Sequence, residues 1–121
     1  MNQCNYCSKV HNSAVSAFGY PDDLVERLLD NIETAPVDAR LKPILQFVRK
    51  LTVDQTRMVQ RDADAVIAAG WDEEDLALAV AICSLFNFMN RMVHGLGIEE
   101  DPEYTLGAGA RLKERGYSGF Q

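Results

Sequence analysis

The feature that most constrains the fold is a segment from Asp72 to about Val93 with the pattern of one long helix, whose middle would be apolar around nearly its whole circumference. Asp72 and the acidic residues behind it are typical of a helix start, because carboxylates complement the positive end of the helix dipole. The middle, Leu76–Phe88, has almost no polar face, so such a helix lies either at the centre of a fold or in a subunit interface. Gly95 and Gly97 predict its end.

The remaining chain also shows helical periodicity, and no useful stretch alternates apolar and polar residues as a strand would. Pro21, Asp38 and Thr56 are expected near three helix starts, where proline and capping side chains are favoured. The expected helices cover residues 3–18, 21–33, 38–51, 57–69 and 72–93, and a weaker pattern suggests a short helix over 106–115. The buried face of the third is expected to carry Leu41, Ile44, Leu45, Val48 and Leu51. The sequence therefore predicts an all-α fold of about five helices in a single domain, residues 1–121.

Charge and composition argue against several classes of protein. The 121 residues carry a formal net charge of -6, and the pI is about 4.8. Nucleic acids and anionic membranes would repel such a chain, so neither is an expected partner. The longest near-apolar run, Leu76–Met89, is interrupted by Ser84 and Asn87 and falls short of the roughly 20 apolar residues that span a bilayer. No secretory signal peptide is visible at the start, so we expect a cytoplasmic protein.

Two cysteines and a histidine near the N-terminus have the spacing of a single helix face. They are Cys4, Cys7 and His11. With a turn of about 100° per residue, Cys7 lies about 60° and His11 about 20° from Cys4 around the helix axis. Cys7 and His11 are also four residues apart, so their side chains can meet. The three side chains are therefore expected to form one site.

The chemistry of this trio is that of a redox site. The thiolate is the nucleophilic form of cysteine, and an ordinary thiol is mostly protonated at neutral pH. A nearby histidine and the positive end of a helix dipole would favour the thiolate of Cys7. A second thiol, Cys4, can then capture the sulfenic acid or mixed disulfide that Cys7 forms. The sequence thus predicts Cys7, Cys4 and His11 as catalytic residues.

Other interpretations of the same residues stay open. Cys4, Cys7 and His11 could supply three zinc ligands, with Cys83 or His94 as a distant fourth, or the spacing could be a coincidence. Cys83 inside the apolar helix is more typical of a small core residue, and His94 of a cation at a helix C-terminus. Asn87, Asn90 and Arg91 are polar residues on the apolar helix. They could anchor the start of the chain, contact another subunit or line the pocket.

The pattern resembles the AhpD-like alkylhydroperoxidase / carboxymuconolactone decarboxylase superfamily, in its peroxidase-related branch. The resemblance covers about residues 3–100. Its motifs are Cys4-Asn-Tyr-Cys7-Ser-Lys-Val-His11, Phe47-Val-Arg-Lys-Leu-Thr52, Ala69-Gly70-Trp71, and Phe86-Asn-Phe-Met-Asn-Arg91 followed by Gly95-Leu-Gly-Ile98. Two features depart from the best-known members. Tyr6 stands where they carry a histidine, and no glutamate-bearing helix precedes the motif. The chain is therefore expected to be a fragment, to have had its start assigned too late, or to take the missing wall from a partner subunit.

The resemblance implies an all-α fold and a peroxidase cycle. It implies that Cys7 attacks the peroxide, that Cys4 resolves the product and that His11 belongs to a proton relay. It implies no metal and no cofactor other than the redox-active Cys4–Cys7 disulfide. The electrons would come from a dithiol, thioredoxin-like or lipoyl partner. It also implies a homo-oligomer, whether dimer, trimer or hexamer. The alternatives are thiol–disulfide exchange or redox sensing without peroxidase turnover, a non-catalytic helical assembly module and, more weakly, a decarboxylase.

Overall fold

The protein is seen here as a computed structural model that describes residues 2–99 and 101–116. Every regular element in these ranges is helical, which confirms the all-α prediction, although there are six α-helices rather than about five. They are α1 (Asn5–Ala17), α2 (Leu24–Asp30), α3 (Leu41–Val53), α4 (Gln60–Ala68), α5 (Glu73–Gly95) and α6 (Pro102–Arg115), with a 3₁₀ turn η1 (Gln55–Arg57) between α3 and α4.

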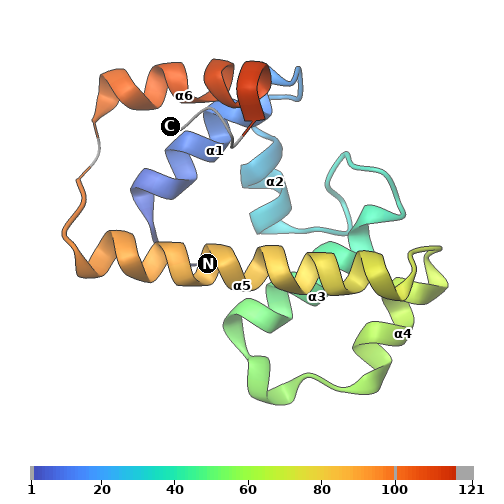
Figure 1. The fold of residues 1–121 in the computed structure, drawn as a ribbon. Coiled ribbons are helices and arrows are strands. Elements are labelled where there is room, and N and C mark those ends of the chain that lie inside the picture. The colour runs from blue at the N-terminus through green and yellow to red at the C-terminus, as the bar shows by residue number, and fades with distance from the viewer. Residues whose placement is uncertain (1, 100, 117–121) are drawn as a thin grey trace.

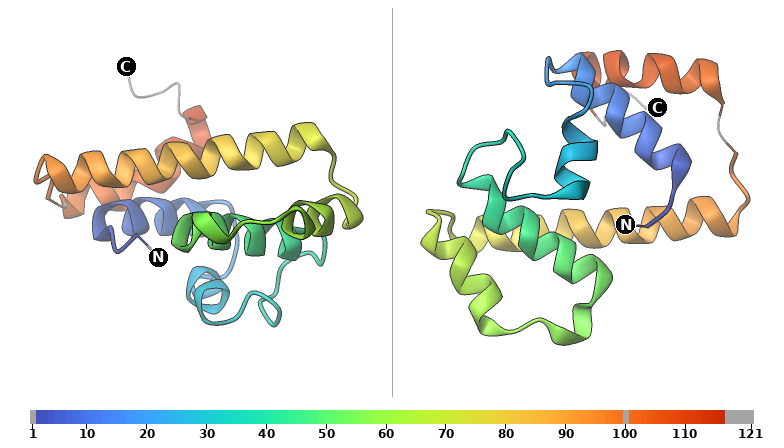
Figure 2. Two further views of the ribbon diagram at one scale, coloured as in Figure 1. Left: turned by 90° about the horizontal axis from the view of Figure 1, so that it is seen from below. Right: turned by 180° about the vertical axis from the view of Figure 1, so that it is seen from behind.

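The long helix α5 runs across the whole molecule and organises the other helices (Figure 1). In that view α1, α2 and α6 lie above α5 and α4 lies below it, while α3 crosses behind α5. The view from below in Figure 2 shows that α1, α3 and α4 line up along one side of α5. These helices cover only part of α5.

The tightest packing joins α1 to α6, the two ends of the described chain. Val10 of α1 is buried against Ala108 and Leu112 of α6. Gly109 of α6 lies directly on the backbone of Ser13, so closely that a methyl group at this position would collide with the Ser13 carbonyl. A residue without a side chain is what such a close approach between two helices requires. The pair fixes the far end of the helix that carries the cysteines.

Helices α3 and α4 form a looser group against α5. The predicted buried face of α3 is only partly covered: Leu41 is exposed, and the other four residues are half-buried. Three of them, Ile44, Leu45 and Val48, line an apolar groove of about 430 Å³ between α3 and α5. The prediction of a fully buried face is therefore wrong, because within the described residues no further layer covers this groove.

Several helix boundaries differ from those expected, each for a local reason. Pro21 lies in a turn before α2 rather than in its first turn, and α2 starts three residues later. Thr56 lies in η1, and α4 begins only at Gln60, where the Asp62 carboxylate accepts the Val59 N–H. The last helix is longer than predicted because Asp101 caps it, accepting two backbone N–H groups, and Pro102 occupies its first turn.

Helix α5 leaves most of its apolar surface uncovered. Among its residues only Asn90 and Val93 are buried, while side chains such as Leu78, Leu85 and Phe88 are more than half exposed. By length and composition α5 could cross a bilayer, and only 11% of its most apolar stretch is buried. The expectation that no segment is long and apolar enough to span a bilayer is therefore wrong, because interruptions such as Ser84 and Asn87 leave the segment apolar on average. A helix of this kind is weak evidence for a membrane segment, because core helices pass the same test.

Candidate functional site

The site begins at the first turn of α1, where the backbone positions both thiols. Cys4 precedes the helix in extended conformation (φ -92°, ψ 98°) and serves as its N-cap, with Sγ accepting the Cys7 N–H at 3.4 Å. The expectation that Cys4 is itself helical is therefore wrong by one residue, because the cysteine takes the capping role that usually falls to Ser, Asp or Asn. Capping turns the Cys4 side chain back over the first turn, toward Cys7.

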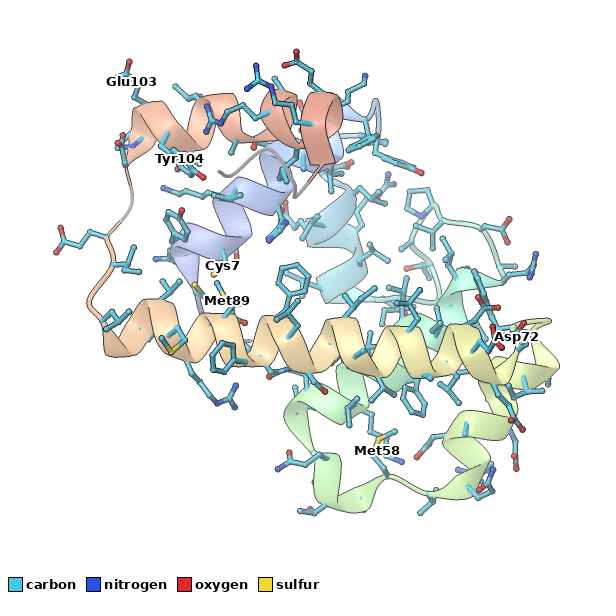
Figure 3. All side chains as sticks on the ribbon, viewed as in Figure 1. Cys7, Met58, Asp72, Met89, Glu103 and Tyr104 are labelled. Carbon is cyan, nitrogen blue, oxygen red and sulfur yellow. The ribbon has the colours of Figure 1, made fainter. Side chains whose placement is uncertain are left out.

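The two sulfur atoms lie next to each other. Cys4 Sγ and Cys7 Sγ are 2.6 Å apart and share a hydrogen bond, and both cysteines are in the thiol form. Cys4 is buried, with 3% of its surface exposed, whereas Cys7 is half-buried. Figure 3 shows Cys7 where the start of α1 approaches α5. The pair is thus placed to interconvert between dithiol and disulfide, with Cys7 as the accessible sulfur.

The surroundings of Cys7 favour the protonated thiol. Burial raises the pKa of Cys7 to about 11, and its hydrogen bond with Cys4 acts in the same direction. A hydrogen bond from the Asn90 side chain lowers the pKa without offsetting the burial. This opposes the expectation that His11 and the helix dipole make Cys7 a ready thiolate. The sequence spacing places groups on a face but does not show how far that face is removed from water.

His11 lies beside the thiols without bonding to them. Its ring packs edge-on against Phe86 of α5, with 4.8 Å between ring centroids. Burial lowers the pKa of His11, so the ring is neutral at pH 7 and can accept a proton. In the described part of the chain no hydrogen bond joins His11 to Cys7, but both residues line one cleft of about 280 Å³. The predicted trio is therefore gathered around a common space that could admit a small molecule.

The cleft also contains residues whose role the sequence left open. Its lining includes Asn2 from the start of the chain and Asn90 from α5. Asn90 is buried, and its Oδ1 accepts a hydrogen bond of 2.6 Å from Asn2 Nδ2. In the sequence, the one indication that Asn90 belongs to the site is that it is a polar residue on an apolar helix. It could not show that Asn90 faces a thiol, because that depends on how α1 crosses α5.

The remaining candidates lie elsewhere. Cys83 contacts Thr52 and Asn87 between α3 and α5, away from the cleft lining, and His94 is exposed at the end of α5. Tyr6 faces the other way and stacks on Tyr104 of α6, and burial raises its pKa. Within residues 2–99 and 101–116, no three His, Cys, Asp or Glu side chains are grouped so that they could hold a metal ion.

Comparison with known proteins adds one informative match. No protein-family model and no curated protein matches the sequence. Among solved structures, the fold is similar to an uncharacterized peroxidase-related protein from Silicibacter sp. TM1040, with a TM-score of 0.76 and 28% sequence identity. The match covers 86% of this chain and 55% of that one, so the chain spans little more than half the length of the solved structure. The fold is therefore that of a peroxidase-related protein.

Proposed function

We propose that the chain is an AhpD-like alkylhydroperoxidase of the peroxidase-related branch, which reduces hydroperoxides with the Cys4–Cys7 dithiol. The observation that carries the proposal is the pair of sulfurs 2.6 Å apart beside a cleft that His11 also lines. The CxxCxxxH spacing and the likeness to the peroxidase-related structure support the same reaction.

In the proposed cycle the Cys7 thiolate attacks the terminal oxygen of a hydroperoxide. The S–O bond forms as the O–O bond breaks, which leaves a sulfenic acid on Cys7 and releases an alkoxide. The proton from the Cys7 thiol passes through His11 to that alkoxide, which departs as an alcohol. Cys4 then attacks the Cys7 sulfur, so that a disulfide forms and water is lost. A thioredoxin-like or lipoyl dithiol returns two electrons and two protons and is itself oxidised to a disulfide.

The assignment of roles follows from accessibility and protonation. Cys7 is the half-buried sulfur at the cleft, so a peroxide can reach it, whereas Cys4 is almost completely covered. A buried resolving thiol is protected from the peroxide and needs to reach only its neighbour. His11 can serve as a base because burial lowers its pKa and keeps the ring neutral.

The direct test mixes reduced protein with an organic hydroperoxide such as cumene hydroperoxide and follows peroxide consumption and protein mass. Cys7→Ser should abolish consumption, because the attacking sulfur is gone. Cys4→Ser should allow one turnover and stop at a Cys7 sulfenic acid, which dimedone traps as a defined mass increase. Cys83→Ser is the matched control and should behave as wild type. Wild-type consumption by Cys7→Ser would refute the proposal.

A second function, thiol–disulfide exchange or redox sensing without peroxidase turnover, needs only that the adjacent Cys4 and Cys7 interconvert between dithiol and disulfide. The Cys7 pKa of about 11 leaves little thiolate at neutral pH, which slows attack on peroxide and on other disulfides alike but does not decide how stable the Cys4–Cys7 disulfide is. A redox titration with glutathione buffers separates the two cases. If the Cys4–Cys7 couple oxidises within the cytosolic range of glutathione redox potentials and the protein turns over no peroxide, redox sensing is favoured. A couple that stays reduced throughout that range would exclude it.

A further inference from the structure

Asn90 is a buried amide on a helix whose large apolar side chains are mostly exposed. Only 8% of its surface is exposed, and it lines the same cleft as Cys4, Cys7 and His11. A buried amide needs partners for both its oxygen and its nitrogen. The orientation of the Asn90 amide therefore decides whether an acceptor or a donor faces the cleft.

A chain of amide hydrogen bonds settles this orientation, beginning at a backbone carbonyl of α5. Asn87 Nδ2 donates to the Cys83 carbonyl at 2.9 Å, and a carbonyl can only accept. The oxygen of the Asn87 amide therefore points away from Cys83. Arg91 Nη1 donates to that oxygen at 3.3 Å, which agrees with this orientation.

The next link is Asn2, which lies between the two amides of α5. Asn2 Nδ2 donates to Asn87 Oδ1 at 3.1 Å and to Asn90 Oδ1 at 2.6 Å. If the Asn90 amide were rotated by half a turn, its N–H groups would face those of Asn2, donor against donor. The oxygen of Asn90 is thus committed to Asn2, and its nitrogen is directed elsewhere. Gln3 has a positive φ of 50°, and this left-handed residue lies between Asn2 and the N-cap of α1.

We propose that Asn90 is a catalytic residue whose Nδ2 donates a hydrogen bond to Cys7 Sγ and stabilises the thiolate that attacks peroxide. Asn2 and Asn87 are positioning residues, which act on the thiol only by holding the Asn90 amide in this orientation. The proposal rests on the proposed peroxidase function for its catalytic meaning. A donor aimed at the sulfur stabilises the charged form selectively, because hydrogen bonds to ionised groups are stronger than those to neutral ones.

Among the side chains around Cys7, Asn90 is the one whose hydrogen bond lowers the pKa, and a backbone N–H adds a smaller effect in the same direction. The titratable neighbours are Cys4 at the N-cap of α1 and Tyr6 and His11 within that helix, and the cleft lining also includes Ser8 and Asn12 of α1. From α5 the cleft receives Phe86 besides Asn90, and from α2 it receives Val25. Neither Phe86 nor Val25 can donate a hydrogen bond. The side-chain hydrogen bond from Asn90 lowers the pKa of Cys7, against the effects of burial and of Cys4.

The test measures the pKa of Cys7 in a protein where it is the sole thiol. Cys4→Ser and Cys83→Ser provide that background, and the pH dependence of iodoacetamide alkylation gives the pKa. Adding Asn90→Asp should raise the pKa by about one unit or more, which is about a tenfold loss of thiolate at neutral pH. The new carboxylate can still accept a hydrogen bond from Asn2 Nδ2, but it offers Cys7 no N–H.

Asn12→Asp is the control for added charge, because Asn12 lines the same cleft, at an exposed position outside the amide chain. It adds the same charge and should shift the Cys7 pKa much less. Asn2→Ala is the second variant, at a half-buried position before α1, and should raise the pKa by releasing the Asn90 amide. Circular dichroism checks the fold of each variant.

An unchanged Cys7 pKa in folded Asn90→Asp, or an equal shift in Asn12→Asp, would overturn the proposal. If Asn90→Asp does not fold, Asn2→Ala decides the question: a raised pKa supports the amide chain, and an unchanged pKa refutes it. No peroxide is present in this assay. A failure of the proposed peroxidase activity is therefore distinguishable from a failure of the hydrogen bond to Cys7.

Discussion

At the scale of single residues, the reactivity of this protein depends on how strongly the fold holds a proton on Cys7. The pKa of about 11 predicts that the thiolate fraction grows about tenfold for each pH unit above neutrality until the pH approaches that value. The rate of a single turnover with an organic hydroperoxide, measured by stopped flow, should rise steadily between pH 7 and about 9.5. A rate that levels off near pH 8 would show that the thiol ionises much more easily than its burial indicates.

The second prediction concerns His11 and the stability of the fold at low pH. Burial lowers the pKa of His11 in the folded protein. At a pH between the folded and the unfolded pKa of His11, the unfolded chain therefore binds more protons than the folded protein does. The stability due to the neutral ring is present above the ordinary pKa of about 6.5 and is lost as the pH falls through the folded pKa. Thermal unfolding should therefore show a lower midpoint at pH 5 than at pH 7.

His11→Phe is the matched variant for this effect, because an aromatic ring can still pack on Phe86 but cannot be protonated. Its unfolding midpoint should vary less between pH 7 and pH 5 than that of the wild type. If the unfolding midpoint decreases equally in both proteins, groups other than His11 cause the sensitivity to acid. The same variant should also slow peroxide consumption at neutral pH, since it removes the proposed proton carrier.

At the scale of elements, the contact between α1 and α6 depends on Gly109. A Cβ at this position would collide with the Ser13 carbonyl, and a backbone atom cannot move aside as a side chain can. Gly109→Ala should therefore force the helices apart and cost about 1–3 kcal/mol, as overpacking typically does. Urea unfolding measures this loss of free energy.

Gly107→Ala is the control within the same helix. A Cβ there would meet only the end of the Arg111 side chain, which can move away. Replacing a helical glycine by alanine otherwise favours the helix by up to about 1 kcal/mol. Gly107→Ala should thus be neutral or mildly stabilising, and an equal destabilisation by both variants would argue against the close approach at Gly109.

The elements also show what the sequence could predict. Hydrophobic periodicity located five helices, because that signal is local. Helix boundaries such as the start of α4 were not predictable in this way, because several neighbouring residues could have served as the helix cap. Gly109 gave no signal, because the reason for a glycine lies in another helix. For α3 the apolar stripe was recognised, yet its burial depends on what covers the groove, which periodicity cannot report.

The candidate site shows the same division. The spacing of Cys4, Cys7 and His11 was enough to predict a shared face, since helix geometry is fixed, and the three residues do line one cleft. The protonation of Cys7 was not predictable, because it depends on burial and on Asn90 from a helix more than eighty residues away. Asn2 could be recognised only through its bonds to α5, which unite the start of the chain with that helix.

At the scale of the whole molecule, the open side of α5 carries an apolar stripe. Its members are Leu78, Ile82, Leu85, Met89, Met92 and Leu96, all exposed and spaced four, three, four, three and four residues apart. This alternation of threes and fours is the spacing of a helix seam that packs against another helix. The opposite side of α5 carries Cys83, Asn87 and Asn90 in polar contacts, so the apolar surface is a seam rather than the full circumference that lipid would require. We therefore propose that a second copy of the chain packs its own α5 on this stripe.

The stripe yields the last prediction, which concerns assembly. Light scattering at micromolar concentration should give a mass above the 13.5 kDa of one chain, as a dimer or a higher multiple. Leu85→Arg, in the centre of the stripe, should shift the protein toward monomer, because a charge would be buried in the apolar contact. Leu106→Arg is the matched control, since Leu106 is 84% exposed on α6 and outside the stripe. A wild-type protein that stays monomeric would contradict packing of two α5 helices on the stripe. An equal effect of Leu85→Arg and Leu106→Arg on the mass would contradict it as well. Binding of the wild type to lipid vesicles instead would identify a bilayer as the partner of α5.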